Sequence, residues 1–305
     1  MIEIKSVTKN YGNFTAIENI NLVAENSSIL GIVGFNGCGK TTLLNICAGI
    51  YKPDNGQALL DGSDAFDNNN ERCLMFYLSD NLWFPASSSV KGAAKYYASY
   101  YPFFDFRIFS SICEIFGLKE RAGIRSLSKG MKKQASLAIA FAAKPRYLLI
   151  DETFDGLDPQ KKEILKKLLL EYINETGASV IIASHDLNEI SGVCDHIAII
   201  NGKNVILNCA IDDVSDHFRR VNLTFENNIT EEAFADINYR KLRISGKTVS
   251  MIICGDIPKE IEKLNAKGYL NIDTTRLTLE EVFIEETEAE NKNEKINSVF
   301  RQNNR

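Results

Sequence analysis

One glycine-rich segment constrains the fold of this 305-residue chain more than any other feature. Residues 34–41 fit the pattern G-x-x-x-x-G-K-[ST], in which x is any residue. The segment follows the apolar run 28–33, typical of a buried strand, and precedes 40–47, typical of a helix. Glycines let backbone N–H groups turn toward a phosphate, and the start of a helix adds positive partial charge. The segment therefore predicts a strand, a phosphate-binding loop and a helix, in that order.

Two side chains of the loop complete this chemistry. Lys40 can reach the outer phosphates as a point charge, and the Thr41 hydroxyl can ligate Mg²⁺. A glycine-rich strand-to-helix turn can also fit the pattern without binding phosphate, and GTPases, kinases and recombinases share the motif. Alone it predicts only a nucleoside triphosphate. The expected nucleotide contacts are Gly34, Phe35, Asn36, Gly37, Cys38, Gly39, Lys40, Thr41 and Thr42.

A second motif is the apolar run 147–150, which ends in the acidic pair Asp151 and Glu152. At the end of a strand, Asp151 can hold Mg²⁺ and Glu152 can polarise an attacking water. Acidic pairs after a strand also commonly cap the next segment. With a phosphate-binding loop on a neighbouring strand, the catalytic interpretation is favoured.

Apolar runs alternate with helical stretches through the first two thirds of the chain. Three runs lack polar alternation, as strands buried on both faces do. Asp158 before Pro159 is typical of a helix start, and Asn201-Gly202 indicates a hairpin. This alternation predicts an α/β fold with a mostly parallel sheet. The expected strands are 2–5, 21–24, 28–33, 73–78, 147–150, 180–183 and 196–200, and the expected helices are 40–47, 129–143 and 159–173.

Two further regions have a different pattern. Residues 90–125 contain two helical stretches around Tyr101-Pro102 and indicate a helical insertion. After about residue 210 the pattern predicts a small α+β domain with a hairpin at Ser245-Gly246, and His217 falls in a polar, linker-like stretch. The polar end, 287–305, is expected to be disordered. The expected strands of the small domain are 221–225, 241–244, 248–254 and 269–274, and its expected helices are 231–235, 259–267 and 279–286.

Composition narrows the class of protein. Thirty-five basic against 40 acidic residues give a net charge of -5, which disfavours nucleic acid as a partner. No run of 18 apolar residues is present, so we expect no membrane span, and the first residues lack the pattern of a secretory signal. The seven scattered cysteines form no C-x-x-C pair, which indicates reduced thiols in the cytoplasm.

Three more motifs make the pattern specific. L-S-K-G-M (127–131) stands at the start of a helix, G-L-D (156–158) follows the acidic pair, and His185 ends an apolar strand. Together with the phosphate loop, this order and spacing over residues 2–208 resembles the ATP-binding subunit of ABC transporters. The resemblance implies a P-loop NTPase core of the ABC ATPase type, with ATP and Mg²⁺ as ligands. It also implies an ATPase that works as a homodimer or heterodimer.

The resemblance also implies roles for individual residues. Tyr11 matches the aromatic residue that stacks on adenine. Ser128 and the Gly130 backbone match the signature that contacts the γ-phosphate held by the other protomer, and this role is favoured over a simple helix cap by Ser128.

In the same family pattern Glu152 is the general base, His185 senses the γ-phosphate, and Asp158 lies in the loop that joins two active sites. A tyrosine near a strand is more often part of a core, and a histidine after a strand is usually structural. Their places in the motif order favour the functional roles.

Two positions depart from the family pattern. Met131 stands where the signature commonly ends in glutamine, and nucleotide binding should survive this change. Asp80 stands where the family usually has a glutamine that reaches Mg²⁺ and water. Asp80 offers a negative oxygen ligand but no donor, so it would either tighten Mg²⁺ binding or weaken the positioning of water.

The function expected from the resemblance is an ATP-binding subunit that drives a separately encoded transmembrane permease, in the manner of bacterial exporters. Its place would be the cytoplasmic face of the membrane, held there by the permease. The alternatives are a soluble ABC-type ATPase acting on ribosomes or DNA, and a regulatory subunit without turnover. We expect an ATPase domain at 1–209 with a helical subdomain at about 85–143, and an accessory domain at 210–286 that stabilises or regulates the dimer.

The permease is expected to dock on the helical insertion, because aromatic residues crowd it. Nine aromatics are more than so small a subdomain easily buries, although all of them could be core. They are Trp83, Phe84, Tyr96, Tyr97, Tyr100, Tyr101, Phe103, Phe104 and Phe106.

Overall fold

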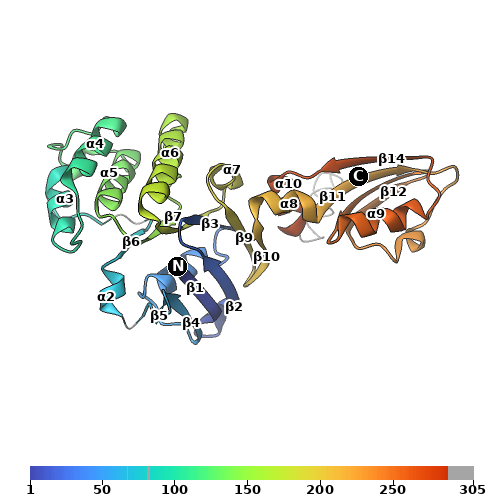
Figure 1. Ribbon diagram of the computed structural model, residues 1–305, viewed down its shortest axis with the longest axis horizontal. Helices are drawn as coiled ribbons and strands as arrows, with labels where there is room; N and C mark the ends of the chain where they lie inside the picture. The colour runs from blue at the N-terminus through green and yellow to red at the C-terminus, as the bar shows by residue number, and fades with distance from the viewer. Residues whose placement is uncertain (67, 81–82, 288–305) are drawn as a thin grey trace, which may run out of the picture. The chain divides into compact units, whose positions relative to one another are not determined.

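The computed structural model describes residues 1–66, 68–80 and 83–287 (Figure 1). The chain divides into two compact units, one from Met1 to Cys209 and one that begins at Ala210. Each unit has a hydrophobic core of its own.

A mostly parallel sheet forms the centre of the first unit, as the alternating pattern predicts. β3 pairs in parallel with β8 and β9, and β7 with β6 and β8. β8 is buried at every residue, which explains its uninterrupted apolar sequence. Asn201-Gly202 lies between β9 and β10, which are neighbours in the sheet. In the described part of the unit, the strand order is β10 (Asn204–Ala210), β9 (His196–Asn201), β3 (Ser28–Val33), β8 (Ser179–Ser184), β7 (Tyr147–Asp151) and β6 (Met75–Leu78).

An antiparallel sheet is the part of this unit that the pattern predicted least well. Two of its strands were expected to be much shorter, and the other two were not expected at all. The longer of the two unexpected strands begins with the exposed Asn55-Gly56-Gln57, so it lacks the apolar run that indicates a strand. The strand order is β2 (Phe14–Ala24), β1 (Ile2–Tyr11), β4 (Asn55–Leu60) and β5 (Ser63–Asp64).

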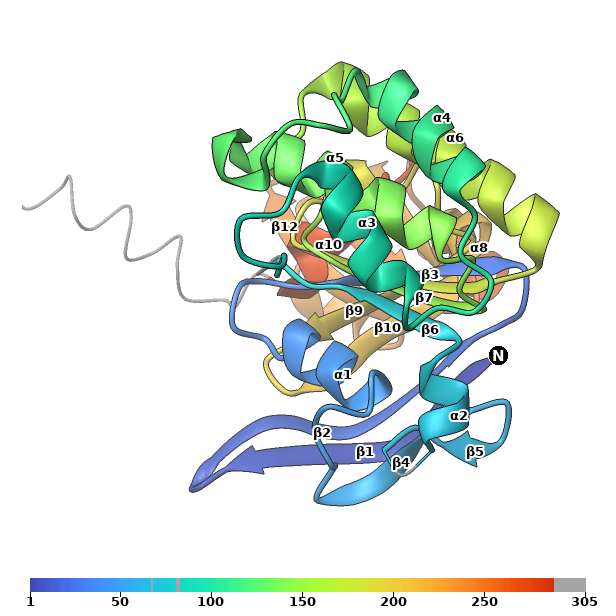
Figure 2. The same ribbon diagram turned by 90° about the vertical axis from the view of Figure 1, so that its left-hand side faces the viewer.

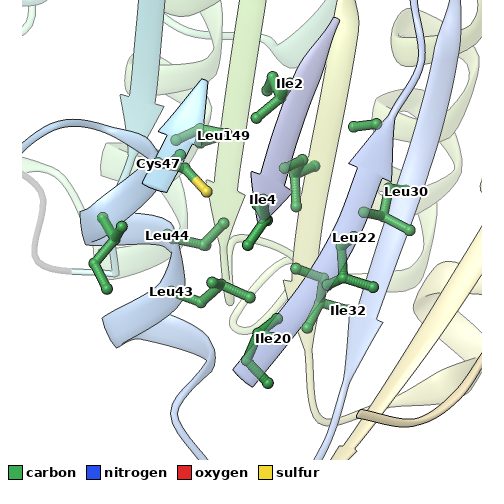
Figure 3. Packing of buried hydrophobic residues seen from close by; sticks show 14 of the residues in the cluster. Ile2, Ile4, Ile20, Leu22, Leu30, Ile32, Leu43, Leu44, Cys47 and Leu149 are labelled. Atoms are coloured by element: carbon green, nitrogen blue, oxygen red, sulfur yellow. The ribbon is translucent and has the colours of Figure 1, made fainter. Parts of the chain in front are cut away.

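The main core of this unit lies between the two sheets, around α1 (Lys40–Cys47). α1 contacts β1, β2 and β4 of one sheet and β7 of the other. Figure 3 shows Ile4 and Leu22 from the antiparallel sheet, Leu44 from α1 and Leu149 from β7 meeting in this layer. The phosphate-binding loop is therefore attached to a helix packed on both sides.

In the described part of this unit, the longer helices cover the other side of the parallel sheet (Figure 2). The insertion is helical, as expected, and α4 packs against α5, which is buried from Lys133 to Ala142. α6 runs past its expected end and stops at Gly177, which is left-handed. The helices are α3 (Val90–Ala98), α4 (Phe106–Phe116), α5 (Lys129–Ala142) and α6 (Pro159–Thr176); shorter elements are α2 (Asn69–Arg72), α7 (Leu187–Ile190) and the 3₁₀ turn η1 (Ile124–Ser126).

The second unit is an α+β domain with an antiparallel sheet. One face of the sheet is packed with apolar residues, among them Val221, Phe234 and Leu264. The linker-like stretch around His217 is instead helical, and the expected helix at 231–235 is a 3₁₀ turn. Thr287, the first residue of the expected tail, ends a helix, and 288–305 lie outside the described residues. The strand order is β12 (Tyr239–Ser245), β13 (Thr248–Cys254), β11 (Phe218–Thr224) and β14 (Asn271–Arg276); the helical elements are α8 (Ile211–His217), η2 (Glu231–Phe234), α9 (Ile257–Asn265) and α10 (Leu279–Thr287).

Candidate active site

The candidate site lies at the carboxyl edge of the parallel sheet, where ligands bind in open α/β folds. β3, β8 and β7 are adjacent strands, so the segments that follow them come together. These segments carry the phosphate-binding loop, His185, and the acidic pair.

Close packing explains two glycines of the loop. Gly39 has a φ of 103°, and a Cβ there would lie 2.3 Å from the Ile17 side chain. A Cβ on Gly34 would lie 2.5 Å from the carbonyl oxygen of Ile200. α1 then begins at Lys40 without a side-chain cap, so its first N–H groups are left for another acceptor. A phosphate is the acceptor that such a helix start binds best.

Lys40 crosses the loop and is only 5% exposed. Its Nζ donates to the carbonyl oxygen of Gly34 at 2.7 Å and to that of Phe35 at 3.3 Å. The same Nζ lies 3.3 Å from Oε1 of Glu152. The buried ammonium is thus balanced by the carboxylate expected to be the base.

Asp151 and Thr41 fit a bound Mg²⁺. The Thr41 hydroxyl donates to Oδ2 of Asp151 at 2.8 Å, and the Tyr77 hydroxyl donates to the same oxygen at 3.3 Å. Oδ1 of Asp151 is buried and accepts no hydrogen bond from the described residues. Burial raises the pKa of Asp151, and the hydrogen bond from Thr41 only partly opposes this shift. A buried oxygen without a donor, next to a hydroxyl, is a donor set that a hard cation favours.

Glu152 lies between Lys40 and His185. Its Oε2 is 2.8 Å from Nδ1 of His185, which is also 3.9 Å from Oδ2 of Asp155. The hydrogen bond with Glu152 is the main cause that raises the pKa of His185, and burial opposes it. Glu152 has a φ of 48°, a conformation that residues other than glycine rarely adopt and that clusters at functional sites.

Tyr11 is exposed beside the loop. Its hydroxyl lies 3.5 Å from Oγ1 of Thr42, and its ring meets the edge of Tyr51 at 6.3 Å between centroids. The ring therefore presents a free surface, as the adenine role requires. Tyr51 was not predicted, because a single tyrosine after a helix carries no distinguishing signal.

The signature segment has structural roles within the chain. The Ser128 hydroxyl accepts a hydrogen bond from the Met131 N–H at 3.2 Å and so caps α5, and Asp158 caps α6 in the same way. A Cβ on Gly130 would lie 2.5 Å from the carbonyl oxygen of Gly156. Glycine is thus required at 130 by a neighbouring loop, a contact that no local pattern could predict.

Asp80 is paired with lysines. Its Oδ1 lies 3.2 Å from Nζ of Lys133 and 3.6 Å from Nζ of Lys129. Lys133 also donates to the backbone oxygen of Glu152. Sequence reasoning missed Lys133; the only available signal was a lysine on the apolar face of a helix.

Comparisons with known proteins relate this chain to ABC transporters. A family model described as "ABC transporter" matches residues 17–155. The ABC transporter ATP-binding protein YtrB of Bacillus subtilis is 27% identical over 290 residues, which cover 93% of this chain and 97% of YtrB. The methionine import ATP-binding protein MetN 1 of Listeria innocua is 27% identical over 274 residues, covering 84% and 80%.

Solved structures share the fold. An ATP-binding cassette solved as a dimer after hydrolysis, with ADP and phosphate bound, superimposes with a TM-score of 0.60 at 23% identity. The match covers 69% of this chain and 98% of the cassette. In the part of the chain that the structure describes, no helix has both the length and the apolar character to cross a bilayer.

Proposed function

The chain belongs to the ATP-binding subunits of the ABC transporter family, and from that premise we propose that it hydrolyses ATP in a nucleotide-bridged dimer to drive a separately encoded membrane permease. The observation that carries the proposal is the position of the Glu152 carboxylate. One of its oxygens faces Lys40 of the phosphate-binding loop and the other faces His185. A base, a phosphate-binding cation and a second polar group therefore converge at one edge of the sheet.

ATP binding is assigned to the loop and to Tyr11. The uncapped start of α1 and the Lys40 ammonium receive the phosphates, and the exposed Tyr11 ring stacks on the adenine. Thr41 and Asp151 would hold Mg²⁺, which supplies positive charge to the phosphates when it is bound. Oδ1 of Asp151 supports this assignment because it is buried and lacks a donor among the described residues.

Hydrolysis is assigned to Glu152. Without nucleotide, its Oε1 is held by Lys40 at 3.3 Å. When phosphate oxygens take over the Lys40 ammonium, Oε1 is released and can accept a proton from an attacking water. His185 keeps its contact with Oε2 and orients the carboxylate.

The dimer follows from the incompleteness of one chain. The proposed γ-phosphate contacts of Ser128 and Gly130 come from the other protomer, and Asp158 lies in the loop that joins the two sites. ATP would bridge the chains and ADP would not, because only ATP carries the γ-phosphate. The dimeric cassette of the same fold supports this arrangement.

The permease is proposed to dock on exposed aromatics of the helical insertion. Of the nine aromatic residues there, five are exposed: Trp83, Tyr96, Tyr100, Phe103 and Phe106. The ring centroids of Trp83 and Tyr96 are 5.2 Å apart, as are those of Tyr96 and Tyr100. Such a cluster on the surface suits an apolar segment of a membrane protein, and docking would place the chain at the cytoplasmic face of the membrane.

The proposal includes no direction of transport. The sequence favoured export, but MetN 1 is named an import protein, so the relatives give export no support. The relatives are named as transporter components, which disfavours a soluble ATPase that acts on ribosomes or DNA. The second unit is proposed to stabilise or regulate the dimer.

The dimer is tested by measuring the size of Glu152→Gln by light scattering with Mg-ATP and with Mg-ADP. The amide keeps the shape of the side chain but is a far weaker base, so the variant should bind ATP, dimerise and barely turn over. Two results together would contradict the proposal. They are a Glu152→Gln variant that binds ATP but stays monomeric, and isolated wild-type monomers that hydrolyse ATP at full rate.

Docking is tested by co-purification of the permease from solubilised membranes with Trp83→Ala. Leu270→Ala is the matched control, because Leu270 is an exposed apolar residue of the second unit. Trp83→Ala should reduce co-purification and Leu270→Ala should not. Equal recovery with both variants would place the docking surface elsewhere.

A further inference from the structure

Lys133 is buried in the first unit, with only 1% of it exposed. A lysine is almost never buried to this extent unless its charge is paired. Lys133 lies in the second turn of α5, the helix that begins at the L-S-K-G-M segment. The buried ammonium of Lys133 is therefore expected to be paired, and its contacts identify the partners.

The ammonium joins three elements that each carry a motif. Nζ of Lys133 donates to the backbone oxygen of Glu152 at 2.5 Å. The same atom lies 3.2 Å from Oδ1 of Asp80, which follows β6. The contacts thus link the helix of the signature, the turn that carries the proposed base, and the segment where the family has its glutamine.

We propose that Lys133 is a positioning residue that holds the peptide of Glu152 in its unusual conformation and couples it to α5. The inference rests on the proposed role of Glu152 as the general base. It adds a residue beyond the L-S-K-G-M segment to the proposed machinery of hydrolysis.

The backbone of Glu152 shows why such a residue is needed. Glu152 has a φ of 48°, which persists only when the surroundings fix it. Its N–H donates to the oxygen of Ala183 on β8, and its carbonyl oxygen accepts from Lys133 on α5. The backbone N–H and the backbone carbonyl of Glu152 are thereby each hydrogen-bonded to a different element. Without the ammonium, the carbonyl oxygen loses its donor and the residue can relax toward an ordinary conformation, moving the carboxylate away from Lys40 and His185.

Asp80 acquires a role in the same arrangement. A buried ammonium needs a compensating charge, and Asp80 supplies it from a half-exposed position. Glutamine at residue 80 could accept a hydrogen bond but could not neutralise Lys133. The departure at Asp80 is therefore explained by the lysine at 133, without any contact to Mg²⁺.

The test uses the full chain and three lysine variants. Lys133→Met keeps the length of the side chain but removes the donor and the charge, and Lys133→Arg keeps both. Lys132→Met is the matched control, because Lys132 is the preceding residue of α5 and is partly exposed. Mg-ATP hydrolysis gives kcat and KM, and thermal unfolding shows whether each variant is folded.

Lys133→Met should lower kcat by about 10- to 100-fold, the loss typical of a misplaced catalytic group, with KM and the melting temperature nearly unchanged. Lys133→Arg should recover most of kcat, and Lys132→Met should match the wild type. An undiminished kcat in Lys133→Met would overturn the inference. So would a loss in kcat that merely follows a loss in thermal stability.

A double-mutant cycle tests the part assigned to Asp80. Asp80→Asn should lower kcat in the wild-type background and have little further effect in Lys133→Met, because the two residues act through one contact. Additive losses would show that Asp80 acts independently of Lys133.

A readout without turnover separates this inference from the proposed function. If Lys133→Met moves the Glu152 carboxylate, the imidazole pKa of His185, followed by NMR, should fall toward its ordinary value. Inactive wild-type protein with this shift present would contradict the proposed function and support the positioning role. Active wild-type protein whose Lys133→Met variant shows neither the shift nor a loss of kcat would overturn the positioning role alone.

Discussion

The parallel sheet of the first unit and the antiparallel sheet of the second unit place their polar residues differently. In the first unit β8 is buried at every residue, whereas in the second unit β14 exposes five of its six residues. Parallel strands covered on both faces must be apolar along their length, so polar groups gather where several strands end. Antiparallel strands with an open face spread their polar groups along that face. The candidate active site lies in the first kind of sheet for this reason.

The two units also differ in how each one pairs a buried carboxylate, Asp151 in the first unit and Glu260 in the second. Burial raises the pKa of Asp151, and its Oδ1 lacks a donor among the described residues. Burial also acts on Glu260 of α9, but hydrogen bonds from Lys263 and the Asn238 N–H outweigh it and lower its pKa. Glu260 is satisfied within the chain, whereas Asp151 is left ready for a ligand. The difference fits the proposed role of Asp151 as a ligand of Mg²⁺.

The largest expected effect is the loss of turnover in Glu152→Gln. Removal of a general base typically costs about 100- to 10,000-fold in rate, so kcat for ATP should fall within that range. Glu260→Gln makes the same chemical change at a buried acid of the second unit and should leave kcat unchanged. A steady-state phosphate-release assay measures kcat of both variants. An equal loss of kcat in the two variants would contradict the assignment of hydrolysis to the first unit.

Lys40→Ala should have the next largest effect, on ATP binding. A charge-assisted hydrogen bond is worth about 1.5–3 kcal/mol, so ATP affinity should weaken by roughly 10- to 100-fold. Lys267→Ala, which removes an ion pair with Asp236 in the second unit, should not change affinity. Calorimetric titration with ATP compares the two variants. Unchanged affinity in Lys40→Ala would mean that the phosphates bind elsewhere.

The residues that could be predicted from sequence are those carried by local motifs. The loop 34–41, the acidic pair and His185 follow strands that proved adjacent, so the rule for carboxyl edges brings them together. Their positions could be predicted for that reason, and their catalytic roles remain proposals. The parallel sheet could be predicted equally well, because its buried strands are continuous apolar runs.

The unpredicted features depend on contacts between distant residues. β4 begins with exposed polar residues and is defined by its pairing with β1, more than 40 residues away. Tyr77 and Lys133 reach the acidic pair from a strand and a helix without any motif. The pairing of Asp80 with Lys133 could not be predicted either, because the spacing of the two residues in the sequence carries no signal for it.

Gly130→Ala should destabilise the first unit. The added Cβ would lie 2.5 Å from the Gly156 carbonyl oxygen, and overpacking of this kind typically costs about 1–3 kcal/mol. Gly123→Ala is the control, because a Cβ there meets nothing within 4 Å. Hydrogen exchange measures the stability of each unit separately. Protection of β7 amides should fall in Gly130→Ala, and protection of β13 amides should stay the same in both variants.

The pH dependence of the Glu152–His185 pair should be a smaller effect. The folded-state pKa of His185 is raised, chiefly by its hydrogen bond with Glu152. The pair therefore stabilises the fold fully below the unfolded-state pKa of about 6.5 and loses this contribution as the pH rises through the folded value. An NMR titration of His185 should show a raised pKa that falls in Glu152→Gln. An identical pKa in both proteins would contradict the contact.

The smallest effect should come from ending the chain at Cys209, the last residue of the first unit. The cores of the two units are made of separate residues, and every proposed contact to ATP, from Tyr11 to His185, lies before this point. A unit with its own core can fold alone, so ATP affinity measured by calorimetry should not change. If the second unit regulates the dimer, the shortened Glu152→Gln protein should bind ATP normally but dimerise at a different concentration. Loss of ATP binding by a folded, shortened protein would show that the second unit takes part in nucleotide binding. It would contradict the assignment of nucleotide binding to the first unit alone.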